Sequence, residues 1–121
     1  MNALTVRGVK ILHVGADPEL LWLRTAVLRK HWQVRSVHFK DAQRTLQNSI
    51  FDMVLICHSV PQEAREDLED FLTENAFPSV VISLRQDLPE DQVVRTALGL
   101  ELSTGPDTLV ARLDYLLRKA S

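Results

Sequence analysis

The sequence predicts an α/β fold in which helices cover both faces of a parallel β-sheet. Three short apolar segments, residues 9–14 (VKILHV), 53–57 (MVLIC) and 78–84 (PSVVISL), are typical of strands that are buried on both faces. Longer amphipathic segments separate them, and helix-start signals such as the Asp-Pro-Glu motif at residues 17–19 open these segments. Strands that alternate with helices favour a parallel sheet with right-handed crossovers.

The first half of the chain is expected to contain three strands and two helices. The strands are residues 9–14, 33–39 and 53–57, and the helices are residues 17–31 and 41–47. Asp17 suits the N-cap of the first helix, because a proline follows it at the first helical position.

The side chains of this first helix divide into a core stripe and an outer face. The apolar residues expected to face the core are Leu20, Leu23, Val27 and Leu28. Arg24 falls within the same arc, Trp22 projects opposite to it, and Leu21 lies at its edge.

The second half is expected to contain three helices and two further strands. The helices are residues 62–74, a segment that opens at Pro89 and stops near Gly99, and a last helix that opens at Gly105. The strands are residues 78–84 and a short fifth strand at residues 100–102. Five strands of this spacing fit a flavodoxin-like doubly wound sheet of order 2-1-3-4-5, with five helices in a three-layer sandwich. With 121 residues, the chain is expected to form one domain, residues 1–121.

Composition excludes several classes of protein. A hydrophobic fraction of 45% and a charged fraction of 25% are ordinary for a globular chain. No apolar run approaches the roughly 18 residues of a membrane span, and the N-terminus lacks a signal peptide's apolar stretch. Cys57 is the only cysteine, which excludes a disulfide within the chain. These features favour a cytoplasmic protein without a membrane partner.

The charges are distributed unevenly along the chain. Residues 1–60 carry eight Lys or Arg against four Asp or Glu, whereas residues 61–121 carry six against twelve. The difference indicates either solvated helix faces of opposite sign or an acidic face that meets a basic partner. Neither half is basic enough to suggest nucleic acid as a partner.

Four segments carry a resemblance to a known family. KILHVGADPEL, FDMVLICHSVP, FPSVVISL and GPDTLVARLDYLL stand in this order at the first, third and fourth strands and the last helix. Together they resemble the corresponding segments of bacterial response-regulator receiver domains, the CheY-like family. The resemblance spans residues 10–119 and implies a role in two-component signal transduction, either as a stand-alone protein or as a domain of a longer regulator.

The resemblance also implies which positions would carry the family's chemistry. Receivers use an acid pair that holds Mg²⁺, an aspartate that accepts the phosphoryl group, a hydroxyl and a lysine. The corresponding positions here are Gly15 and Ala16 for the acids, Cys57 for the phosphoacceptor, Ser83 for the hydroxyl, and Gly105 or Leu102 for the lysine. Among these positions, only Ser83 has a side chain of the type that receivers use there. We therefore expect a degenerate pseudo-receiver that is not an enzyme, cannot be phosphorylated on aspartate, and needs no metal or other cofactor.

Two alternatives use the same edge of the sheet. A thiol-based redox or acyl-transfer function at Cys57 would require an accessible, reactive thiol. His58 is adjacent but points to the opposite face, whereas His13 on the neighbouring strand could lie closer. The second alternative is a small ligand bound where Gly15, Ala16 and Ser83 converge.

Protein contacts are the remaining hypothesis. Trp22 and Leu21 are expected at the outer face or edge of the first helix, and aromatic residues are enriched at interfaces. Receivers often dimerise through the fourth helix, fifth strand and fifth helix. That resemblance implies a contact lined by Arg95, Glu101, Arg112, Asp114 and Tyr115. The expected partner is a second copy of the chain or another protein.

Overall fold

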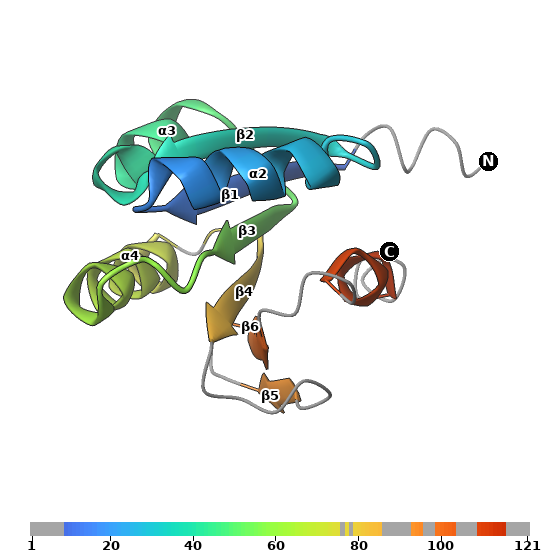
Figure 1. Ribbon diagram of the computed structural model, residues 1–121. Helices are drawn as coiled ribbons and strands as arrows, with labels where there is room; N and C mark the ends of the chain where they lie inside the picture. The colour runs from blue at the N-terminus through green and yellow to red at the C-terminus, as the bar shows by residue number, and fades with distance from the viewer. Residues whose placement is uncertain are drawn as a thin grey trace.

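A six-stranded sheet forms the centre of the molecule, with strand order β2-β1-β3-β4-β6-β5 (Figure 1). The computed structural model describes residues 9–75, 77, 79–85, 93–95, 99–103 and 109–115. The strands are β1 (Lys10–Gly15), β2 (Gln33–His38), β3 (Met53–Ile56), β4 (Val80–Arg85), β5 (Val93–Arg95) and β6 (Gly99–Ser103). The helices are α2 (Pro18–Leu28), the 3₁₀ turn η1 (Phe39–Asp41), α3 (Ala42–Asn48), α4 (Gln62–Glu74) and a helical segment at residues 109–115.

The sheet confirms the predicted parallel order. β1 pairs in parallel with both β2 and β3, β3 pairs with β4, and β4 pairs with β6. β6 therefore stands in the place of the expected fifth strand. Most element boundaries differ from the predicted ones by one to three residues, and α4 has the predicted boundaries.

β5 corrects the sequence prediction. The prediction of a helix that opens at Pro89 is wrong at residues 93–95. These residues instead form an edge strand antiparallel to β6. Val93 and Val94 favour an extended backbone because their side chains are β-branched. Residues 86–92 and 96–98, which hold the rest of that predicted helix, lie outside the described residues.

Two hydrophobic clusters fill the space between the sheet and its helices. The cluster on one face contains Leu28 and Trp32 from α2 and the turn after it, and Leu109 and Leu113 from the segment at residues 109–115. The cluster on the other face contains Ala42 and Leu46 from α3 and Leu68 and Leu72 from α4. Strand side chains alternate between the two clusters, so the described part of the chain is the predicted three-layer sandwich. Within it, no helix has the length and apolar character of a membrane span.

The orientation of α2 differs from the prediction. Leu28 is buried as expected, but Leu23 and Val27 are 51% and 45% exposed, and Thr25 is buried in their place. Thr25 faces the sheet because its hydroxyl oxygen lies 2.9 Å from Nδ1 of the buried His13 on β1. The face of α2 that this polar pair holds against the sheet is therefore not the face that the apolar periodicity of the helix indicates.

Candidate functional site

The loops that follow β1 and β3 are joined at the carboxyl edge of the sheet. The Ser59 hydroxyl accepts hydrogen bonds from the backbone N–H groups of Ala16 (3.1 Å) and Asp17 (3.4 Å). The Asp17 carboxylate accepts from the N–H groups of Glu19 and Leu20, so it caps α2 as predicted. The bond from Ala16 fixes the second of the two positions, Gly15 and Ala16, at which the resemblance implies the acid pair.

Leu21 occupies the space beside Gly15, the first of the two implied acid positions. Gly15 is buried, and a Cβ atom added to it would lie 2.9 Å from Leu21 Cδ1 and 3.6 Å from Cys57 Cβ. Real Cβ contacts are almost never that short, so a carboxylate at Gly15 would have to displace the leucine. Leu21 is half-buried here, which places it between α2 and the sheet edge rather than on the outer face.

Two guanidinium groups contact Cys57, which stands at the implied phosphoacceptor position. Cys57 is fully buried at the end of β3. Arg24 Nη1 on α2 donates to its Sγ at 2.7 Å, and Arg65 Nη2 on α4 donates to its backbone carbonyl at 3.2 Å. The sequence contained one signal for each arginine: Arg24 lies within an otherwise apolar arc, and Arg65 is the only basic residue of the acidic α4.

Two imidazoles lie near these cations. Burial, and secondly the charge of Arg24, lower the pKa of His13 to about 3. The pKa of the half-buried His58 is also lowered, first by burial and then by Arg24 and Arg65, while Asp17 opposes the shift. His13 Nε2 and His58 Nδ1 are buried and have no hydrogen-bond partner in the described structure. Both rings are therefore expected to be neutral at pH 7.

The remaining positions of the implied phosphorylation site are only partly described. Ser83 is buried on β4, opposite Ile56 of β3 and Glu101 of β6. Leu102 pairs with Leu84 in the sheet, and Gly105 lies outside the described residues. Among the residues that the structure describes, no group of three or more His, Cys, Asp or Glu could hold a metal ion.

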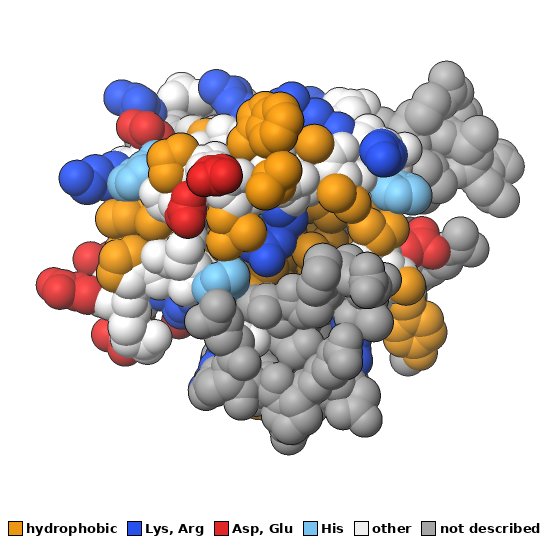
Figure 2. Space-filling model, in the orientation of Figure 1, with side chains coloured by type: hydrophobic (Ala, Val, Ile, Leu, Met, Phe, Trp, Pro, Cys, Tyr) orange, Lys and Arg blue, Asp and Glu red, His pale blue; other side chains and the backbone are white. Residues whose placement is uncertain are grey.

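The predicted interface residues fall on separate elements. Trp22 on α2 is 69% exposed and Tyr115 is 59% exposed. Figure 2 shows hydrophobic side chains gathered over α2. Arg112 and Asp114 are half-buried. Arg95 and Glu101 lie on the paired strands β5 and β6, where Arg95 is opposite Leu100 and Glu101 is opposite Val94. The role of these residues in a contact stays a prediction.

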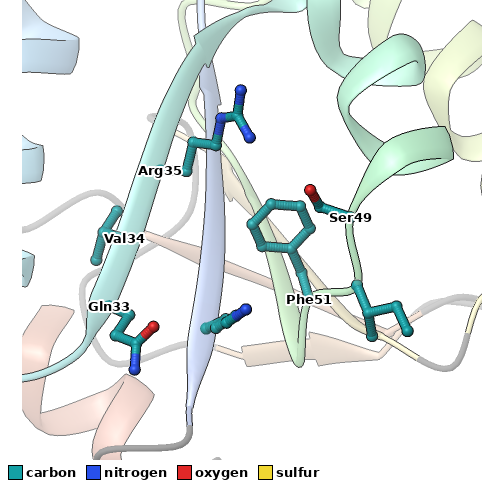
Figure 3. A pocket seen from close by; sticks show the side chains of 7 residues that line it. Gln33, Val34, Arg35, Ser49 and Phe51 are labelled. Atoms are coloured by element: carbon teal, nitrogen blue, oxygen red, sulfur yellow. The ribbon is translucent and has the colours of Figure 1, made fainter.

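Hollows are present at two places, among others, on the described surface. One, of about 240 Å³, lies between α2 and the helical segment at residues 109–115. The other, of about 220 Å³, lies at the amino ends of β1 and β2, at the opposite end of the sheet from Cys57. Figure 3 shows Arg35 and Ser49 on either side of the Phe51 ring in this second hollow. Its polar side chains come from exposed strand ends and a loop, so we assign it no chemistry.

Comparison with known proteins shows the fold. No family model matches the sequence, and no curated protein matches it significantly. Solved receiver domains nevertheless resemble the structure. The receiver domain of the Francisella response regulator 1452 has a TM-score of 0.73 and 16% identity, over 94% of this chain and all of that one. The chemotaxis protein CheY4 of Vibrio cholerae has a TM-score of 0.68 and 16% identity, over 88% and 97% of the two chains.

A third similarity comes from the structure of the histidine kinase ThkA in complex with the response regulator protein TrrA. A chain of that structure has a TM-score of 0.61 and 15% identity, over 90% of this chain and 98% of that one. Together these similarities show that the chain has the CheY-like receiver fold, as the sequence predicted.

Proposed function

We propose that this chain, which has the receiver fold, is a non-catalytic pseudo-receiver that acts through contacts with other proteins. The observation that carries the proposal is the environment of Cys57. Arg24 and Arg65 contact this residue from two helices, and Leu21 fills the space beside Gly15. We further propose that residues 1–121 form one cytoplasmic domain that is not an enzyme and binds neither nucleic acid nor a membrane.

The electrostatics of this edge support the loss of phosphoryl transfer. Mg²⁺ requires oxygen ligands and is usually held by carboxylates. Gly15 and Ala16 offer none, and the cationic groups of Arg24 and Arg65 would repel a divalent cation at Cys57. Phosphoryl transfer depends on positioned metal and charge, so a buried thiol that accepts from the Arg24 guanidinium is unsuited to it.

The first prediction concerns phosphorylation. Incubation with acetyl phosphate and Mg²⁺ should give no stable phosphoryl adduct by intact-protein mass spectrometry, and beryllofluoride with Mg²⁺ should leave the amide NMR spectrum unchanged. The Cys57→Asp variant is the control. It restores a carboxylate but no metal ligands at Gly15 and Ala16, so it should also stay unmodified. A stable adduct on the wild-type chain would overturn the proposed loss of chemistry.

The second prediction concerns the exposed face of α2. If Trp22 anchors a contact with a second copy, sedimentation equilibrium should show self-association that Trp22→Ser weakens by about tenfold or more. Ile50→Ser is the matched control, because Ile50 is a large exposed apolar side chain at the other end of the sheet. A wild-type chain that is monomeric at all accessible concentrations would reject the homodimer and leave a different protein as the partner.

The thiol hypothesis has less support. It required an accessible Cys57, whereas the residue is fully buried. A buried thiol cannot meet a bulky acyl donor or redox partner without an opening of the structure.

A further inference from the structure

The hollow between α2 and the helical segment at residues 109–115 combines an apolar wall with a single cation. Its volume is about 240 Å³, and its lining consists of Leu20, Leu23, Arg24, Val27, Leu28, Leu109 and Val110. Figure 2 shows hydrophobic side chains over α2 next to a basic side chain. Six of the seven lining residues are therefore apolar, and Arg24 is the one that can recognise charge.

The charge of Arg24 has no anionic partner in the described structure. Its guanidinium is half-buried and carries five N–H donors, of which one nitrogen contacts the Cys57 sulfur. A sulfur atom is a weak acceptor, so this contact leaves the charge of Arg24 unneutralised. A partly desolvated cation is stabilised by a nearby anion, so this site favours an anionic ligand.

We propose that this hollow binds a small carboxylate with an apolar body. The carboxylate would accept hydrogen bonds from the planar fork of Arg24, a geometry that suits carboxylates well. The apolar body would pack against Leu23, Val27 and Val110. This binding site is independent of the proposed signalling role.

Size and polarity select this ligand class over others. Ligand pockets commonly have volumes of about 300–1,000 Å³, so a hollow of about 240 Å³ suits a small molecule. A phosphate group is disfavoured, because phosphates usually need several donors and the lining offers one cation among apolar residues. The competing occupant is a peptide helix that inserts one glutamate side chain into the hollow. Binding of such a peptide without binding of hexanoate would distinguish it from a small carboxylate.

Binding would also change the contacts of Cys57. The carboxylate would compete with the thiol for the Arg24 guanidinium, which now lies 2.7 Å from the sulfur. The positive charge of Arg24 contributes to the lowered pKa of His58. An anion beside Arg24 should cancel part of this effect, so the pKa of His58 should rise on binding. His58 therefore reports occupancy from outside the hollow.

The test is an NMR titration of the full chain with hexanoate at pH 7. Saturable shifts should appear for amides of α2 and residues 109–115. The Arg24→Gln variant should bind about tenfold or more weakly, and hexanamide, which lacks the charge, should lose affinity similarly. Lys30→Gln is the matched control, because it removes one exposed positive charge just beyond the end of the same helix and should bind normally.

A second variant keeps the proposal testable if Arg24→Gln fails to fold. Val27→Glu introduces a carboxylate one helical turn from Arg24, at a position that is 45% exposed, and should block hexanoate. The proposal is overturned if hexanoate gives no saturable shifts, if hexanamide binds equally well, or if Lys30→Gln binds as weakly as Arg24→Gln. It is also overturned, in favour of a protein occupant, if a glutamate-containing amphipathic peptide binds and hexanoate does not.

Discussion

Lowering the pH from 7 to 5 should reduce the free energy of unfolding by about 2 kcal/mol through His13 alone. The pKa of this histidine falls from 6.5 to about 3 on folding, because the ring is buried and Arg24 lies nearby. Between these two values the unfolded chain binds a proton that the folded chain does not bind. Its contribution to stability is therefore complete above pH 6.5 and is lost as the pH falls towards 3.

Urea denaturation at several pH values measures this effect. The His13→Gln variant should show a flatter dependence of unfolding free energy on pH than the wild-type chain. His58→Gln separates the second contribution, which has the same sign because the pKa of His58 is also lowered. If wild-type and His13→Gln chains lose stability equally between pH 7 and pH 5, then His13 is not held neutral by burial.

Replacing Leu28 by alanine should lower the free energy of unfolding by about 2–5 kcal/mol, the usual cost of a cavity at a buried leucine. Leu28 is fully buried in the cluster between α2 and the sheet. Leu23→Ala, on the same helix, should cost about 1 kcal/mol or less, because that side chain is 51% exposed.

Both substitutions replace a leucine of α2 by alanine, so the difference between their effects tests the orientation of this helix directly. Both can be measured by chemical denaturation at pH 7. Equal losses of stability would mean that Leu23 is packed in the core, as its spacing in the sequence indicates, and that the hollow beside Arg24 is filled.

Local features of the chain were predictable from the sequence. Asp17 caps α2 because a short acceptor side chain precedes a proline, and this signal needs no tertiary contact. α4 has its predicted bounds, since its apolar residues recur at helical spacing. The central strand β3 was also predictable, because four consecutive apolar residues suit a strand that is covered on both faces.

The candidate site was less predictable, because its contacts join residues far apart in the chain. Periodicity places Leu23 in the core, but it cannot detect that the pair of His13 and Thr25 turns another face of α2 to the sheet. Nor could it place Arg24 and Arg65 on the same cysteine, since each contact depends on how a helix docks. β5 was missed for a similar reason, because three residues carry too little pattern to outweigh a helix-start signal.

Cys57 serves as a junction between the two helical layers. Its N–H donates to the Val14 carbonyl of β1, its carbonyl accepts from Arg65 of α4, and its sulfur accepts from Arg24 of α2. Since α2 and α4 pack on opposite faces of the sheet, this residue is a shared attachment point for both. The contact with α2 uses the side chain of this residue, and the contact with α4 uses its backbone. The end of β3 thus links the helices on the two sides of the sheet.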